Sequence, residues 1–210
     1  MIRIMIADDH AIVRSGLKQI LEENHDMKVV AEHAHGATAL QWIRANNCDV
    51  VLLDISMPGM NGFEVLKLIH DEKPKLPVLI LSIYPEDQYA MRLIKAGAAG
   101  YLTKESAPEV VVEAVRQVAG GKKYISATVA EILAKEIGTS DGKLPHETLS
   151  DREYQIFLLF ASAKTTTEIA TSLDLSAKTV STYRSRILDK MHLRNNAELM
   201  RYAVEKLPSL

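Results

Sequence analysis

Apolar residues in the first 120 positions follow two patterns that alternate along the chain. Short apolar runs, typical of strands, are separated by longer segments in which apolar residues recur every three or four positions, as in amphipathic helices. The predicted strands are 2–7, 27–32, 50–53, 77–82 and 98–102, and the predicted helices are 12–21, 37–43, 63–69, 86–95 and 108–118. Five strand–helix alternations favour an α/β fold with a doubly wound, five-stranded parallel sheet.

The third predicted strand is the most informative. Its apolar run Val50–Leu53 is continuous, which is typical of a strand covered by helices on both faces. The run ends at Asp54, and Pro58-Gly59 and Asn61-Gly62 then break the chain. Ligands of open α/β sheets bind outside the carboxyl ends of the strands, so Asp54 is a candidate site residue. A lone aspartate here could also serve only to start a turn.

The pattern changes after Gly120-Gly121. A helical segment at 126–137 and a polar stretch at 138–145, typical of a linker, come first. Four helical patterns follow at 150–162, 166–173, 177–191 and 195–206, and Ser150 and Glu153 form a capping box at the start of the first. We expect an α/β domain at 1–120, a linker with a short helix at 121–146 and a small all-α domain at 147–210.

Composition excludes several classes of protein. The formal net charge of −2 gives no global basic field, although a local basic face remains compatible with it. Cys48 is the single cysteine, so neither an intramolecular disulfide nor a cysteine-rich metal site can form. We find neither the apolar core of a signal peptide nor a run long enough to cross a membrane. We therefore expect a soluble cytoplasmic protein that makes no contact with a membrane.

Four of the predicted strands end in, or are followed by, polar side chains that could act together in one site. The first is followed by Asp8 and Asp9, the third by Asp54, the fourth ends in Ser82, and the fifth is followed closely by Lys104. Carboxylates converging in one crevice repel one another, and a hard divalent cation such as Mg²⁺ relieves that repulsion. A nearby hydroxyl and an ammonium can bind the oxygens of a phosphoryl group. The site is therefore suited to Asp54 acting as a nucleophile that becomes an aspartyl phosphate.

The motifs that carry this chemistry resemble the receiver domain of two-component response regulators, a flavodoxin-like fold. They are Ile6-Ala-Asp8-Asp9-His10, Leu53-Asp54-Ile-Ser-Met-Pro58-Gly59-Met-Asn-Gly62, Leu81-Ser82 and Gly100-Tyr101-Leu-Thr-Lys104. The resemblance covers about residues 1–120.

This resemblance implies a role for each matching residue. Asp54 would be the phosphoacceptor; Asp8, Asp9, Asp54 and the backbone carbonyl of Ser56 would hold Mg²⁺; Lys104 would pair with the phosphoryl group, and Ser82 would hydrogen-bond to it. Tyr101 matches the aromatic position that turns inward during switching, and a half-buried strand residue is the alternative for it.

The helical tail resembles the helix-turn-helix output domain of LuxR-type (NarL/FixJ) regulators. The matching segments are 148–153, 167–170 with Leu173, Leu175-Ser176 and 178–180. Helical geometry puts Val180, Ile187 and Met191 on one face of the segment 177–191. The opposite, polar face is free to enter a major groove and offers Lys178, Ser181, Thr182, Ser185 and Arg186 as candidate DNA contacts.

The tail also departs from the family's pattern. Ser181 stands where the family usually has Lys, Tyr183 where it has His, and Ala163 where it has Gly before the turn; Thr166-Thr167 replace Asn-Lys. The segment from Pro145 onward contains nine Lys or Arg and eight Asp or Glu, so it is nearly neutral. Electrostatic attraction to DNA should therefore be modest and dimerisation important. The alternative is a helical module that binds protein.

Together these features predict a non-enzymatic, phosphorylation-controlled transcription factor. Its partners would be a sensor histidine kinase and double-stranded DNA, bound by a homodimer at promoter half-sites. A phosphatase with an aspartyl nucleophile is a rival from another class. Phosphatases of the haloacid dehalogenase type need a second carboxylate two residues after the nucleophile, and Ser56 occupies that position. A signalling adaptor whose helical domain binds protein is a third possibility.

Overall fold

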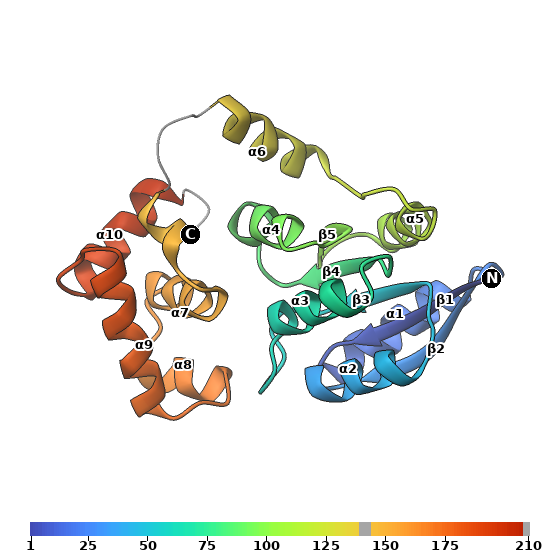
Figure 1. Ribbon diagram of the computed structural model, residues 1–210, viewed down its shortest axis with the longest axis horizontal. Coiled ribbons are helices and arrows are strands. Elements are labelled where there is room, and N and C mark those ends of the chain that lie inside the picture. Colours follow the sequence, from blue (N-terminus) through green and yellow to red (C-terminus); the bar gives the residue numbers. More distant parts are fainter. Residues whose placement is uncertain (139–143, 208–210) are drawn as a thin grey trace. The chain divides into compact units, whose positions relative to one another are not determined.

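A computed structural model describes residues 1–138 and 144–207 of the chain (Figure 1). The chain forms two compact units, Met1–Glu136 and Ile137–Leu210, which we describe separately. Positions 139–143 of the predicted linker and the last three residues lie outside the described residues. Within the described residues, no helix combines the length and apolar character that crossing a membrane requires.

The first unit contains a five-stranded sheet in the order β2-β1-β3-β4-β5, with every pair parallel. Its strands are β1 Ile2–Ala7, β2 Met27–His33, β3 Val50–Leu53, β4 Val78–Ser82 and β5 Gly100–Thr103. The helices between and after them are α1 Ala11–Glu22, α2 Gly36–Ala45, α3 Gly62–Glu72, α4 Glu86–Lys95 and α5 Pro108–Ala119. The predicted doubly wound sheet is confirmed, and its order places β1, β3, β4 and β5 side by side.

Strand β3 shows why the sheet is covered on both sides. Side chains alternate between the faces of a strand. Val50 and Leu52 belong to the apolar cluster that α1 and α5 complete on one face. Val51 and Leu53 point to the other face and are also fully buried. The continuous apolar run therefore reflects two packed faces, which fixes the strand's carboxyl end and the residue that follows it.

The chain after α5 returns along the outer strand β5. Tyr124 forms a parallel bridge with Gly100, and its backbone N–H donates to the Ala99 carbonyl at 2.8 Å. A Cβ at Gly100 would lie 2.7 Å from the Tyr124 carbonyl oxygen, so this close approach requires glycine. Two residues further on, the Ser126 hydroxyl donates to Glu86 Oε2 at 2.6 Å. Helix α6, Ala127–Gly138, begins at this point, one residue from its predicted start.

The second unit is helical. After a short 3-10 turn, Pro145–Thr148, it contains α7 Asp151–Ala161, α8 Thr166–Ser172, α9 Ala177–Lys190 and α10 Asn196–Lys206. Helix α7 is central because it contacts all three others. The predicted capping box is present: Ser150 N donates to Glu153 Oε2 at 2.7 Å, and the Ser150 side chain accepts from Glu153 N. The predicted four-helix arrangement is therefore confirmed.

Candidate functional site

Four strand ends meet at one edge of the sheet. Parallel pairing sets their register: the Asp54 N–H donates to the Ala7 carbonyl at 2.8 Å, and the Lys104 N–H donates to the Ser82 carbonyl at 2.7 Å. Asp8, Asp54 and Ser82 are each 2% exposed or less. Side chains from widely separated parts of the sequence are thereby held in one buried site.

The Lys104 ammonium is shared by two carboxylates. Its Nζ lies 2.7 Å from Asp8 Oδ2 and 2.8 Å from Asp54 Oδ2. Burial alone would lower the pKa of Lys104, but the two carboxylates raise it above its ordinary value. Burial raises the pKa of Asp54, and Lys104 offsets this only in part. One ammonium faces several acidic groups, so the site attracts a further cation.

The loop after β3 fixes the Asp54 carboxylate. The Ser56 N–H donates to Asp54 Oδ1 at 3.0 Å. Asn61 caps α3 by accepting from the Glu64 N–H at 2.9 Å. At Gly62, a Cβ would lie 2.2 Å from the Asp54 carbonyl oxygen. The turn residues seen in the sequence therefore hold the loop closely against the strand end.

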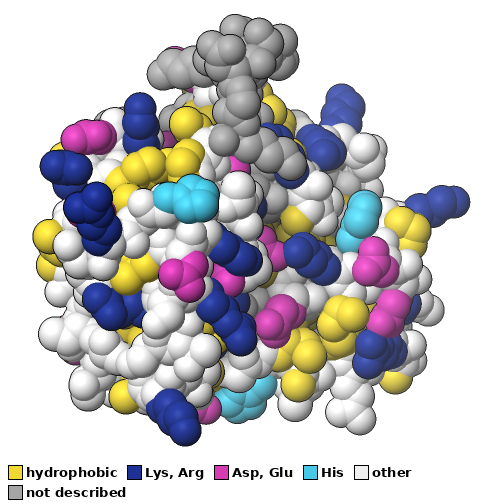
Figure 2. Space-filling model, turned by 60° about the vertical axis from the view of Figure 1, so that its left-hand side comes forward, with side chains coloured by type: hydrophobic (Ala, Val, Ile, Leu, Met, Phe, Trp, Pro, Cys, Tyr) yellow, Lys and Arg dark blue, Asp and Glu magenta, His cyan; other side chains and the backbone are white. Residues whose placement is uncertain are grey.

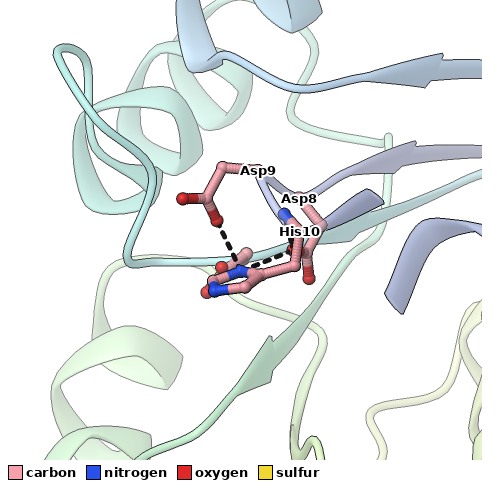
Figure 3. Close-up of side chains that lie close together, drawn as sticks. Asp8, Asp9 and His10 are labelled. Carbon is pink, nitrogen blue, oxygen red and sulfur yellow. Dashed lines mark hydrogen bonds and ion pairs between the residues drawn. The ribbon is translucent and has the colours of Figure 1, made fainter. Parts of the chain in front are cut away.

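His10 joins this site, although the sequence patterns gave it no role. Figure 3 shows its imidazole beside the two acids that precede it. Its Nδ1 lies 2.8 Å from Asp9 Oδ1 and 3.2 Å from Asp8 Oδ1. The position of His10 directly after the acid pair is the signal that could have identified it. Which way the ring turns depends on local backbone geometry, and the spacing of motifs does not reveal that.

The donor set fits a divalent cation. Asp8, Asp9, His10 and Asp54 each offer one ligand atom, and these atoms lie within 4.8 Å of one another. Among the described residues, the buried Asp9 Oδ1 receives no hydrogen bond of normal geometry. Such an oxygen is available to a metal ion, and carboxylates are the ligands that Mg²⁺ prefers.

The predicted switch residues lie along β4 and β5. Tyr101 is 1% exposed, and its hydroxyl donates to the Tyr84 carbonyl at 2.8 Å. Burial raises the pKa of Tyr101. The Ser82 hydroxyl accepts from the Tyr84 N–H at 3.2 Å. Tyr101 is thus a fully buried residue rather than a half-buried one, and the turn at Tyr84 connects it to Ser82.

Helix α9 carries the candidate DNA contacts. Val180 and Ile187 are fully buried and the following Met191 is 3% exposed, as the helical pattern predicts. Ser176 caps the helix by accepting from the Thr179 N–H at 3.0 Å. The polar face is exposed at all five candidate positions, Lys178, Ser181, Thr182, Ser185 and Arg186.

The hydroxyls of this face donate to their own helix. Ser181 donates to the Ala177 carbonyl at 2.9 Å, Thr182 to the Lys178 carbonyl at 3.0 Å, and Ser185 to the Ser181 carbonyl at 3.3 Å. A hydroxyl has one proton but two acceptor lone pairs. In this rotamer each can accept from a base amino group, but it must rotate to donate to a phosphate.

Positive charge on this face is sparse. Arg186 lies over the Tyr183 ring, 5.9 Å from its centroid, which orients the guanidinium. Asp189 is exposed one turn further along the helix. On the face of the molecule in Figure 2, Lys and Arg side chains are scattered among acidic and hydrophobic ones. Phosphate contacts from α9 therefore depend mainly on Lys178 and Arg186.

The sheet and its acidic edge are those of a receiver-type signalling domain, and the helical unit is that of a helix-turn-helix output domain. The chain matches the family model "Response regulator receiver domain" over residues 4–116. It also matches "Bacterial regulatory proteins, luxR family" over residues 147–203. The chain belongs to the response regulators with a LuxR-type DNA-binding domain, a family of transcriptional regulators.

Individual proteins that the chain resembles are also response regulators. The chain is 38% identical over 205 residues to response regulator UvrY of Escherichia coli strain K12, covering 97% of this chain and 94% of that protein. It is also 38% identical to response regulator GacA of Pseudomonas aeruginosa, with 97% and 96% covered. The structure is similar to RcsB of Salmonella enterica serovar Typhimurium bound to a promoter with the phosphomimetic BeF3−, at TM-score 0.60 and 27% identity, covering 96% of this chain and 97% of that one.

Proposed function

We propose that Asp54 accepts a phosphoryl group from a sensor histidine kinase and that this modification controls DNA binding by the helical domain. The observation that carries the proposal is the buried Asp54 carboxylate, 2.8 Å from Lys104 Nζ and beside an acid pair. An Asp54 oxygen would attack phosphorus as the N–P bond of the donor's phosphohistidine breaks, which forms an acyl phosphate. The kinase histidine leaves with the electron pair of that bond.

The neighbouring groups have distinct roles in this proposal. Asp8, Asp9, Asp54 and the Ser56 backbone carbonyl would hold Mg²⁺, which would supply positive charge to neutralise the phosphoryl oxygens. Lys104 moves its ion pair from Asp54 to a phosphoryl oxygen, because the phosphoryl group retains negative charge there. The Ser82 hydroxyl donates to the phosphoryl group. If the Ser82 hydroxyl turns toward the phosphoryl group, it would lose its hydrogen bond with the Tyr84 N–H. The turn at Tyr84 would then be free to move, which would alter the surroundings of Tyr101.

The proposed acyl phosphate is a signal and not an intermediate of rapid turnover. A phosphatase of the dehalogenase type would place a general acid two residues after Asp54, and Ser56 has no carboxyl group. Steady hydrolysis of small phosphate esters by the chain would favour the phosphatase instead.

Replacement of the acceptor tests the proposal. Incubated with a small acyl phosphate donor and Mg²⁺, the unaltered chain should acquire an acid-labile, hydroxylamine-sensitive phosphate, whereas Asp54→Asn should acquire none. Asp71→Asn is the matched control, since Asp71 lies exposed on α3 in the same unit. A hydroxylamine-sensitive phosphate that persists in Asp54→Asn would contradict the assignment.

The output half of the proposal is binding of a homodimer to two promoter half-sites, with α9 in the major groove. Similarity to RcsB, whose dimers have been solved on DNA, supports it. The same proposal assigns 1–120 to phosphoryl acceptance, 121–146 to connection and 147–210 to DNA binding, all in the cytoplasm. Capture of a protein by the helical domain without DNA affinity would favour the signalling adaptor.

A further inference from the structure

The imidazole of His10 faces the acidic cluster because of a local turn. The His10 N–H donates to Asp8 Oδ1 at 2.8 Å, which folds the chain back over the acid pair. His10 stands at the N-cap of α1, yet its side chain makes no capping hydrogen bond. The Arg14 guanidinium donates to the Asp8 carbonyl at 2.6 Å and holds the first turn of α1 against this segment. The ring is therefore directed to the acids and not to the helix.

The imidazole is positioned as a ligand. Its Nδ1 lies 2.8 Å from Asp9 Oδ1 (Figure 3). His10 is also one of four residues, with Asp8, Asp9 and Asp54, whose candidate ligand atoms lie within 4.8 Å of one another. The His10 side chain is 58% exposed, so an ion can reach it from solvent. An ion between Nδ1 and the carboxylates would take the place of the direct contact between His10 and Asp9.

A nitrogen donor changes which ion the site prefers. Mg²⁺ favours oxygen ligands and water, whereas imidazole suits later first-row ions such as Co²⁺ and Ni²⁺. We propose that His10 is a specificity-determining ligand that gives the acidic site of this chain a preference for a divalent transition ion over Mg²⁺. This inference rests on the cation site of the proposed function and gives a role to His10, to which the sequence motifs assigned none.

Metal titration of the full chain tests the inference. Calorimetry is run with Co²⁺ alone and with Mg²⁺ alone, at about pH 8, where an ordinary imidazole is neutral. The unaltered chain should bind Co²⁺ at least about tenfold more tightly than Mg²⁺. In His10→Ala the affinity for Co²⁺ should fall at least about tenfold and that for Mg²⁺ by less than about twofold. His10→Asn should behave like His10→Ala, since it keeps a polar group but removes the nitrogen ligand.

The matched control is His25→Ala. His25 is exposed and lies beside Asp26, whose carbonyl accepts from Ile2 N at the opposite end of β1 from the site. Its removal should leave both affinities unchanged. The visible absorption of bound Co²⁺ gives a second readout, because imidazole is a stronger-field ligand than carboxylate or water. The band should shift to longer wavelength in His10→Ala and stay in place in His25→Ala.

The outcomes separate this inference from the proposed function. Equal Co²⁺ affinity in the unaltered chain and in His10→Ala, with Mg²⁺ still bound, overturns the role of His10 and leaves the cation site standing. Binding of neither ion by the unaltered chain overturns the cation site and the inference together. Loss of Co²⁺ binding in His25→Ala instead of His10→Ala assigns the nitrogen ligand elsewhere and also overturns the inference.

Discussion

At the scale of single residues, Asp54 occupies a position that opposes folding. Burial raises the pKa of this carboxyl even though Lys104 lies 2.8 Å away. An acid whose pKa is raised on folding stabilises the folded state at low pH, and this contribution is lost as pH rises through the folded-state pKa. At neutral pH the charged carboxylate therefore destabilises the first unit. Residues arranged for reaction often carry such a cost.

We predict that Asp54→Asn raises the free energy of unfolding of the first unit at about pH 7 by on the order of 1 kcal/mol. Its thermal midpoint should rise accordingly. Asparagine retains an oxygen that can accept from the Ser56 N–H but carries no charge to bury. The gain should shrink as pH falls from neutral through the raised pKa of Asp54, because the carboxyl there becomes protonated and no longer buries a charge. Melting curves across this range measure it, with Asp71→Asn expected to show no such change. A lower midpoint for Asp54→Asn at neutral pH would contradict the argument.

At the scale of elements, the helix ends of the second unit contain a backbone conformation that suits glycine better than the residue present. Ala163 has φ 61° in the turn between α7 and α8. The Ala163 N–H donates to the Phe160 carbonyl at 3.0 Å, and the Lys164 N–H donates to the Leu159 carbonyl at 3.1 Å. These bonds form a Schellman motif, in which the left-handed position is usually glycine because a Cβ is disfavoured there.

We therefore expect Ala163→Gly to stabilise the second unit by about 1 kcal/mol, after allowance for the greater freedom of glycine in the unfolded chain. Ala163 is exposed, so no packing is lost. The thermal midpoint of this unit should rise by about 4–8 °C. Ala161→Gly is the matched control: Ala161 is the last residue of α7, where the backbone is still helical, so glycine should lower the midpoint. Destabilisation by both variants would contradict this prediction. It would mean that the left-handed strain of Ala163 is smaller than the entropy that glycine adds to the unfolded chain.

Much of this architecture could be predicted from sequence because its signals are local. Continuous apolar runs such as Val50–Leu53 mark strands buried on two faces, and polar residues that interrupt them mark the strand ends. The sharing of Lys104 between Asp8 and Asp54 is different, because it depends on the lengths and rotamers of side chains from separate strands. The direction of His10 and the full burial of Tyr101 also depend on packing, which periodicity does not encode.

At the scale of the whole molecule, binding to DNA must work with little net charge on the helical unit. Counterion release makes affinity fall with salt in proportion to the number of phosphates contacted. With Lys178 and Arg186 as the main donors on α9, each subunit should contribute few such contacts. Two subunits on two half-sites double the number, so affinity should depend strongly on the pairing of sites.

We predict that a duplex with two half-sites binds more tightly than one with a single half-site, and that an acyl phosphate mimic strengthens this difference. Lys178→Ala and Arg186→Ala should each weaken binding and reduce the slope of log affinity against log salt by about one per subunit. Fluorescence anisotropy at several salt concentrations measures both effects. Lys206→Ala, an exposed change at the end of α10, is the control. Equal losses in all three variants would assign binding to general charge instead of α9.

The return of the chain along β5 has a consequence for how the protein can be divided. β5 is an outer strand, and bare outer strands invite pairing with other molecules. Tyr124 occupies part of that edge through its hydrogen bond with Ala99. A fragment that ends at Gly120 would lack Tyr124 and expose the unpaired edge of β5, whereas a fragment that continues past Ser126 would keep that edge covered. We therefore expect a fragment of the first unit that includes the segment 121–126 to stay monodisperse in solution, because its outer strand remains covered.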